Sequence, residues 1–152
     1  MDRNSSLDLL YPPLAALAKN FIWRCQNKGF NIEIFETWRS PERQNSLMRQ
    51  EGITRAEAWK SWHNHGLAYD AVFRDGSGAW YWESDHWHDV GQIGKDLGLI
   101  WGGDFKSIVD KPHFQYETKG IDINEAYEIS VKKGQGSIAV WAEIHLREYA
   151  KN

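Results

Sequence analysis

The stretch from Ser61 to Asp70 contains two side chains of the kinds that bind a catalytic metal ion. His63 lies in an expected loop and Asp70 in the strand expected to follow it, and Gly66 allows the backbone to turn between them. Ala68 and Asp70 would then share one side of that strand, so a small residue leaves room for an ion beside the carboxylate. An imidazole and a carboxylate are two of the three protein ligands that a catalytic zinc site needs. Taken alone, this spacing is also common in ordinary surface loops.

A second segment, Asp110-Lys111-Pro112-His113, offers the third ligand. The proline favours an extended chain just before His113, which is expected to begin a strand. Asp110 can lie near the metal without binding it. Three protein ligands leave one position for water, whose pKa zinc lowers towards ~7, and a nearby carboxylate can move a proton from that water to a leaving amine. The pattern suits hydrolysis, with Asp110 as the general base.

The remaining histidines and Asp104 fit ordinary structural roles. His86 and His88, which are flanked by aspartates, have the composition of a metal site, but the helix expected there places them on different faces. We expect both to be structural or solvent-facing, and His145 to lie on a helix surface. His65 is more readily explained without a substrate contact, and turn chemistry accounts for Asp104.

Three motifs follow one another along the chain: Ser-x-His-x-x-Gly-x-Ala-x-Asp at 61–70, Trp-Gly-Gly at 101–103 and Asp-x-x-His at 110–113. Together they resemble the LAS group of peptidoglycan peptidases. The resemblance covers about residues 35–116 and is greatest for the L-alanyl-D-glutamate endopeptidases of phage lysis systems. It implies that His63, Asp70 and His113 bind Zn²⁺. It also places Asp110 at the catalytic acid, which is Glu in some relatives and Asp in the endolysin-like branch.

The segment Glu36-Thr37-Trp38-Arg39-Ser40, with Gln44, resembles the family segment in which an Arg faces the active site. Arg39 is therefore a candidate catalytic and substrate-binding residue, because a guanidinium can bind a carboxylate bidentately or stabilise an oxyanion. A surface salt bridge is the alternative. Gln44 and Gln115 are candidate substrate contacts, with a strand hydrogen bond as the alternative for Gln115. Ser61 is expected to orient a metal ligand.

The elements that must position these residues follow from hydrophobic periodicity and capping signals. Helices are expected at about residues 13–28, 41–50, 54–60 and 84–97, and strands at about 30–38, 67–73, 79–82 and 113–116. Two further helical stretches follow Asn124, separated by residues 133–137. We predict an α+β fold, in which a small, mostly antiparallel sheet has helices packed on one side and the zinc in a cleft on the sheet face. The resemblance implies a Hedgehog/DD-peptidase-like form of this fold.

The composition is that of one globular domain of 152 residues, with 26% charged and 41% hydrophobic residues. We expect a motif-bearing core at about residues 35–116 and a helical segment at about 120–150. A formal net charge of −3 provides no basic field for nucleic acid. Cys25 is the single cysteine, so it forms no internal disulfide and no Cys-rich zinc motif. Nine Trp are present, and most are expected in the core, although Trp80, Trp82, Trp87 and Trp101 are candidates to line the cleft.

No apolar run is long enough for stable membrane insertion, and the first residues lack the pattern of a signal peptide. We therefore expect the protein in the cytoplasm of a producing or host bacterium, acting on the cell wall after release.

The expected function is that of a zinc metallopeptidase that hydrolyses the L-alanyl-D-glutamate bond of peptidoglycan stem peptides, as a monomeric, bacteriolytic endolysin. Release would require a holin if the enzyme is phage-encoded. One alternative is a D-alanyl-D-alanine carboxypeptidase or dipeptidase, which needs a pocket closed around a free carboxylate. The alternative of another class is a non-catalytic, zinc-containing wall-binding module.

Overall fold

The computed structural model describes residues 3–50, 54, 56–132 and 136–150. Its helices and strands are, in chain order, α1 (Pro12–Asn27), β1 (Ile32–Glu36), α2 (Pro41–Met48), β2 (Ala68–Arg74), β3 (Trp80–Tyr81), α3 (Trp87–Asp96), β4 (Ile100–Trp101), β5 (His113–Gln115), α4 (Ile123–Tyr127) and α5 (Gly136–Tyr149). A short 3₁₀ helix, η2 (Trp62–His65), precedes β2, another, η3 (Gly102–Asp104), follows β4, and a π-helical turn, Glu128–Lys132, follows α4.

The strands form one antiparallel sheet in the order β1-β2-β5-β4, and β3 folds back on β2 as a hairpin. The predicted α+β fold with a mostly antiparallel sheet is confirmed. In the middle of the sheet, Asp70 of β2 pairs with Glu36 of β1 on one side and with His113 of β5 on the other. Cross-strand partners point to the same face, so these three side chains form a row across the sheet.

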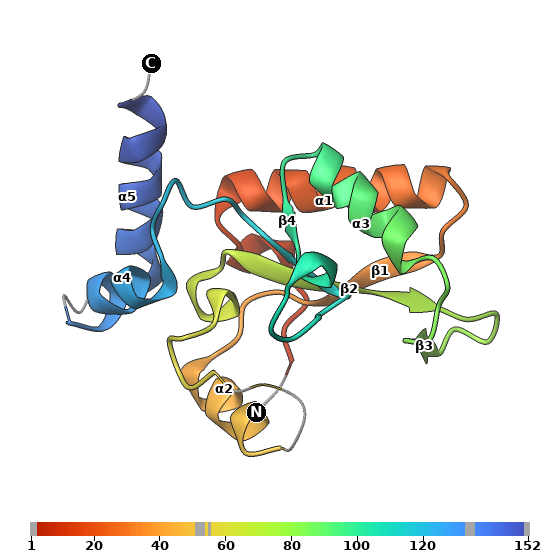
Figure 1. Ribbon diagram of the computed structural model, residues 1–152, viewed down its shortest axis with the longest axis horizontal. Helices are drawn as coiled ribbons and strands as arrows, with labels where there is room; N and C mark the ends of the chain where they lie inside the picture. The colour runs from red at the N-terminus through yellow and green to blue at the C-terminus, as the bar shows by residue number, and fades with distance from the viewer. Residues whose placement is uncertain (1–2, 51–53, 55, 133–135, 151–152) are drawn as a thin grey trace.

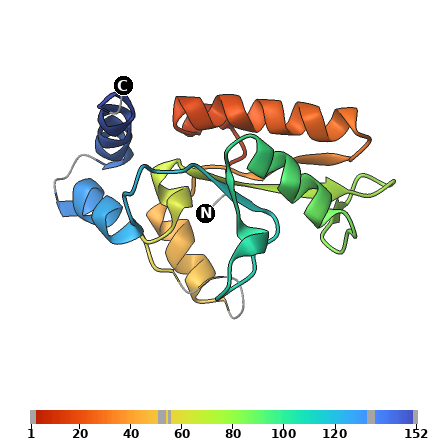
Figure 2. The ribbon, with the colours of Figure 1, turned by 45° about the horizontal axis from the view of Figure 1, so that its top comes forward.

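Helices α1 and α3 cover one face of the sheet, and α2 lies beyond the opposite face (Figures 1 and 2). The alternation of side chains in the strands matches this division, because the aromatic residues point towards α1. Phe114 of β5 and Tyr69 of β2 are fully buried and pack against Phe21 of α1, with ring centroids 4.5 and 5.8 Å away. Their neighbours in sequence, His113 and Asp70, therefore point to the face away from α1.

Most of the expected elements are present within one to three residues of their predicted ends. Pro12 and Pro13 begin α1. The Ser40 hydroxyl accepts a hydrogen bond from the Arg43 amide and caps α2. Gly52, expected near the end of that helix, lies outside the described residues. Strand β4 was not predicted, because a two-residue strand carries no periodicity of its own.

The helix predicted at about residues 54–60 is wrong, because the described part of this stretch forms turns. The backbone amides of Ala58 and Trp59 donate to the side-chain oxygens of Asn45 and Asn64, both at 3.0 Å, in place of helical carbonyls. Trp59 also has a φ of 65°, which a right-handed helix does not allow. Acceptors from other segments thus replace the local hydrogen bonds of a helix.

The chain after β5 forms the expected pair of helical stretches, α4 with its π-helical turn and α5. Helix α5 stands at the edge of the molecule beside η2, and Trp141 donates its indole N–H to the His65 carbonyl at 2.6 Å. Among the described residues, no helix combines the length and the apolar character needed to cross a bilayer.

Candidate metal site and active-site cavity

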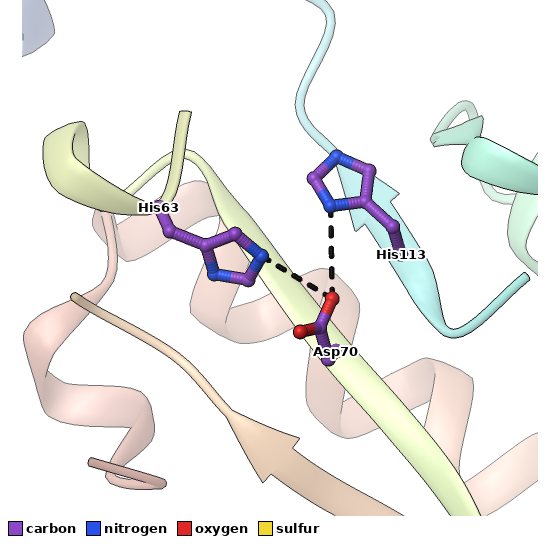
Figure 3. Close-up of side chains that lie close together, drawn as sticks. All are labelled: His63, Asp70 and His113. Carbon is purple, nitrogen blue, oxygen red and sulfur yellow. Dashed lines mark hydrogen bonds and ion pairs between the residues drawn. The ribbon is translucent and has the colours of Figure 1, made fainter. Parts of the chain in front are cut away.

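Three segments bring His63, Asp70 and His113 together on the sheet face opposite α1 (Figure 3). His63 comes from η2, and the other two are cross-strand partners in β2 and β5. One carboxylate oxygen of Asp70 lies 3.2 Å from Nε2 of His63 and 3.6 Å from Nδ1 of His113. The three side chains named from the sequence as candidate ligands therefore converge on one point.

In each imidazole, the nitrogen that faces away from Asp70 makes a hydrogen bond. This bond fixes the ring orientation and therefore which nitrogen faces Asp70. His63 Nδ1 donates to the Thr37 carbonyl at 2.9 Å, and His113 Nε2 donates to the amide oxygen of Gln115 at 2.7 Å. In the neutral imidazoles these bonds leave Nε2 of His63 and Nδ1 of His113 without a proton, so both nitrogens can bind a cation. Gln115, expected as a substrate contact or in a strand hydrogen bond, thus contacts a candidate ligand.

The donor set fits a divalent metal ion. The three donor atoms lie within 4.8 Å of one another. Bonds of about 2.1 Å to a tetrahedral ion require donors separated by about 3.4 Å, close to the 3.2 and 3.6 Å that separate the Asp70 oxygen from the two imidazole nitrogens. Two neutral imidazoles and one carboxylate also match the ligands that borderline metals such as zinc accept.

Electrostatics favour a charged Asp70 beside a less acidic Asp110. Burial opposes ionisation of Asp70, but the two imidazoles outweigh it and hold its pKa well below the usual range. Burial lowers the pKa of His113, and the hydrogen bond and charge of Asp70 more than reverse this, so that it is raised. Burial and the Asp70 charge raise the pKa of Asp110, partly offset by His113, His63 and Arg39. Asp110 Oδ2 lies 3.9 Å from His113 Nδ1.

Arg39 lies beside the candidate ligands, in a buried network. Its guanidinium donates to Glu36 at 2.7 and 3.2 Å and to the Gln44 side-chain oxygen at 2.9 Å, and lies 3.6 Å from Asp70. Glu36 also pairs with Arg43 from α2. The ion pair foreseen as the alternative for Arg39 thus exists, but it is buried: Arg39 is 8% exposed and Glu36 2%.

Gln44 is not placed at the cavity. Its side chain is fully buried, and its amide donates to the Ala56 carbonyl at 2.7 Å while its oxygen accepts from Arg39. The prediction that Gln44 contacts the substrate is therefore wrong. The residue instead links Arg39 to the segment before η2 through hydrogen bonds.

The loop that carries His63 is shaped by its own side chains. The Ser61 hydroxyl accepts from the His63 amide at 3.3 Å, so it supports the candidate ligand through the backbone. Asn64 is fully buried and donates to the Arg39 carbonyl at 2.8 Å. Gly66 has a φ of 67°, and a Cβ there would lie 2.7 Å from the Trp141 ring, so the turn and the approach of α5 both require glycine.

His65 has a structural role that the sequence did not indicate. It is fully buried, donates from Nε2 to the Trp59 carbonyl at 3.0 Å and accepts from the Ser130 hydroxyl at 3.0 Å. Burial lowers its pKa, although the hydrogen bond to Trp59 opposes this. A neutral imidazole thus joins the loop to the C-terminal segment. The other three histidines considered, His86, His88 and His145, are exposed as expected.

A cavity of about 500 Å³ opens over the candidate ligands. It is lined by Phe35, Glu36, Arg39, Arg43, Leu47, Thr54, Ser61, His63, Asp70, Trp82, Asp110, Pro112 and His113. Of the four candidate tryptophans, Trp82 lines this cavity and Trp80 does not, whereas Trp87 and Trp101 are core residues at 4% and 3% exposure. Asp104 pairs with Lys95 at 2.9 Å, away from the cavity. Glu36 and Arg43 were not singled out from the sequence, although their neighbour Arg39 was.

Residues 54–116 match the model of a peptidase family described as D-alanyl-D-alanine carboxypeptidase. The chain is 35% identical over 104 residues to the peptidoglycan L-alanyl-D-glutamate endopeptidase CwlK of Bacillus subtilis, covering 59% of this chain and 62% of the relative. It is 33% identical over 110 residues to the L-alanyl-D-glutamate peptidase of Listeria phage A118, covering 70% of this chain and 37% of the relative. The matches thus span less than two thirds of the length of either relative.

The fold is similar to that of the crystal structure of the Serratia marcescens L-Ala D-Glu endopeptidase ChiX, with a TM-score of 0.59 and 26% identity. The match covers 74% of this chain and 84% of the other. This structural match covers a larger share of the relative's chain than either sequence match does.

Proposed function

We propose that this chain, which is similar to the LAS group of peptidoglycan peptidases, is a zinc-dependent hydrolase that cuts the L-alanyl-D-glutamate bond of peptidoglycan stem peptides. The observation that carries the proposal is the convergence of His63, Asp70 and His113 in one cavity with the carboxylate of Asp110 beside them. The names of the relatives supply the substrate. The whole of residues 1–152 would act as one peptidase domain, with the C-terminal helices supporting the loop of His63.

Zn²⁺ held by these three side chains would polarise the scissile carbonyl and lower the pKa of the attacking water. Asp110 lines the same cavity and has nearly half of its side-chain surface exposed, so it can reach a bound substrate. Its raised pKa suits a group that takes a proton from water and then gives it to the leaving amine of D-glutamate.

The two arginines that line the cavity would have different roles in the proposed enzyme. Arg39 is largely engaged by Glu36 and Gln44, and it lies close to Asp70, so it would keep that carboxylate oriented and ionised. Arg43 donates from its Nε to Glu36 and also lines the cavity. We assign Arg43, next to Arg39 in the cavity lining, as the group that binds a carboxylate of the D-glutamate residue.

The setting of the enzyme belongs to the same proposal. We expect a monomeric, wall-lytic endolysin that reaches peptidoglycan from the cytoplasm, through a holin if it is phage-encoded. The phage relative favours this setting.

A D-alanyl-D-alanine carboxypeptidase is the second candidate, because the matched family model carries that description. Both activities would use the same metal site and the same Asp110. They differ in the bond that is cut.

The test is mass spectrometry of purified peptidoglycan digested with the zinc-loaded protein, beside Asp110→Ala and Asp104→Ala. Asp104 is the matched control, because it is an acid on the surface, paired with Lys95 outside the cavity. We expect fragments that end in L-alanine and others that begin at D-glutamate, made by the parent and Asp104→Ala but not by Asp110→Ala. Loss of terminal D-alanine would establish the carboxypeptidase, and no Asp110-dependent product would leave a non-catalytic wall-binding module.

A further inference from the structure

A second cavity adjoins the candidate active site. It measures about 380 Å³ and is lined by Trp82, Trp87, Val109, Asp110, Lys111 and Pro112. Three of these side chains, Trp82, Asp110 and Pro112, also line the cavity over the candidate metal ligands. A substrate that passes over Asp110 would therefore lie in both cavities at once.

The two cavities differ in chemistry. The first is lined by the candidate ligands and by Arg39 and Arg43. The walls of the second are mainly aromatic and aliphatic, with Lys111 as its cation. Trp82 and Val109 keep 44% and 55% of their surface exposed, so both side chains are accessible to a ligand in this cavity.

Trp82 is exposed but held in place. The edge-to-face contact between Phe35 and Trp82 has a centroid distance of 4.9 Å, and Phe35 makes a similar contact with Trp80 at 5.0 Å. The Trp82 carbonyl accepts the indole N–H of the buried Trp87 at 2.9 Å. A fixed aromatic face beside a cleft costs little conformational entropy when a ligand packs on it.

We propose that this second cavity binds the muramic acid sugar of the substrate, with its ring packed on Trp82; the inference rests on the proposed function. In peptidoglycan the L-alanine of the stem is amide-linked to the lactyl group of muramic acid. The sugar therefore lies on the amino side of the bond to be cut, and the D-glutamate carboxylate lies on the other side. A substrate with its acid at Arg43 and its scissile bond beside Asp110 would bring the sugar to Trp82.

The sugar has the chemistry that this cavity recognises. One face of a pyranose ring consists largely of C–H groups, which pack on an aromatic face, while its hydroxyl and acetamido oxygens accept hydrogen bonds from a cation such as Lys111. The site would thus distinguish a stem peptide attached to the glycan from one that has been detached.

The experiment compares hydrolysis of a muramyl tetrapeptide and of the same tetrapeptide without its sugar, by the parent, Trp82→Ala, Trp82→Phe and Trp23→Ala. Trp23 is the matched control, since it is 63% exposed on α1 and lines neither cavity. We expect the parent to prefer the sugar-bearing substrate. In Trp82→Ala, kcat/KM should fall about tenfold more on that substrate than on the free peptide, mainly through KM. Trp82→Phe should recover part of the preference.

If Trp82→Ala lowers kcat/KM equally on both substrates, or if the parent does not prefer the sugar-bearing substrate, the sugar site is refuted. Either result leaves the endopeptidase proposal unaffected. If the parent cuts neither substrate, the endopeptidase proposal fails, and a binding titration of the muramyl tetrapeptide still decides the sugar site. Saturable binding that weakens in Trp82→Ala but not in Trp23→Ala would support it, and unchanged binding would refute it.

Discussion

The smallest feature on which the candidate metal site depends is the hydrogen bond that turns each imidazole. Gln115 is the clearest case, because its side-chain oxygen accepts from His113 Nε2 at 2.7 Å and so leaves Nδ1 to face Asp70. In Gln115→Leu this acceptor is lost, and we expect metal affinity to fall between about 10-fold and 100-fold. Competition with a chromogenic zinc chelator measures the change.

The matched control is Gln92→Leu, on the exposed face of α3, where the side chain contacts Asp96. An unchanged metal affinity in Gln115→Leu, together with a raised KM, would instead restore Gln115 to the substrate contact expected from the sequence.

The buried carboxylate of Glu36 is the second prediction at this scale. It faces both Arg39 and Arg43 with 2% of its surface exposed. Glu36→Gln keeps the shape but leaves the guanidinium of Arg39 buried without a full counter-charge, so the free energy of unfolding should fall by about 3 kcal/mol. Urea denaturation of the metal-free proteins measures it.

Glu33→Gln is the comparison for Glu36→Gln, because Glu33 forms an exposed pair with Arg74 and should change stability by less than about 1 kcal/mol. Similar losses in the two variants would mean that burial adds nothing to the Glu36 pair.

The sequence indicated the metal-binding candidates but not the groups that hold them. His63, Asp70 and His113 occur in short motifs, and their residue types carry the chemistry. Glu36 becomes important only because β1 pairs it with Asp70, and cross-strand register is not visible in a single sequence. Gln44 was placed on the correct helix, but nothing local shows that its side chain turns inward.

At the scale of elements, the loop of His63 is held against the C-terminal segment by three polar contacts, two from α5 and one from the π-helical turn before it. Trp141 donates to the His65 carbonyl at 2.6 Å, the Ser137 hydroxyl donates to the Asn64 carbonyl at 3.1 Å, and Ser130 contacts His65. The C-terminal helices therefore support the candidate metal site although they contribute no ligand.

Trp141→Ala tests this support. The ring packs over Gly66 and its indole N–H has a single acceptor, so we expect the free energy of unfolding to fall by about 2–3 kcal/mol and the metal to bind more weakly. Chemical denaturation and metal titration give the two numbers. Ile138→Ala, at 73% exposure on the same helix, should leave both close to the parent values. A stable Trp141→Ala with normal metal affinity would show that α5 is dispensable to the loop.

Elements with their own periodicity or caps were predicted, and those determined by distant partners were not. Helices α1, α2 and α3 and strands β1 and β2 follow from apolar spacing and from capping residues such as Ser40. The helix expected at about residues 54–60 fails because Asn45 and Asn64 bind its backbone from outside. These partners become neighbours only once the fold has formed.

For the molecule as a whole, the core around α1 limits stability at high pH. Cys25 is fully buried, and burial raises the pKa of its thiol to about 12, above the 9.0 of a free cysteine. Between these values the unfolded chain releases a proton that the folded chain retains, so stability falls as pH rises above about 9. We expect a loss of about 1 kcal/mol between pH 9 and pH 10 from this group.

Cys25→Ala removes this titrating group. It is expected to be less stable than the parent at neutral pH because of the cavity it leaves, but its unfolding free energy should decline less steeply above pH 9. Urea denaturation at pH 8, 9 and 10 gives the two slopes. Parallel slopes would mean that the thiol ionises equally in the folded and unfolded states.

The metal is expected to stabilise the whole molecule, because its three candidate ligands come from η2, β2 and β5, which are separate in sequence. An ion that binds only the folded chain stabilises it by mass action, by about 4 kcal/mol when its concentration is a thousand times its Kd. For a chain of this length, chelation should then lower Tm by roughly 10 °C in scanning calorimetry. Asp70→Ala removes the ligand that lies between the two imidazoles, so its Tm should not respond to zinc or to the chelator. A zinc-dependent Tm that survives in Asp70→Ala would place the ion elsewhere on the chain, and the proposed hydrolase would lose its metal site.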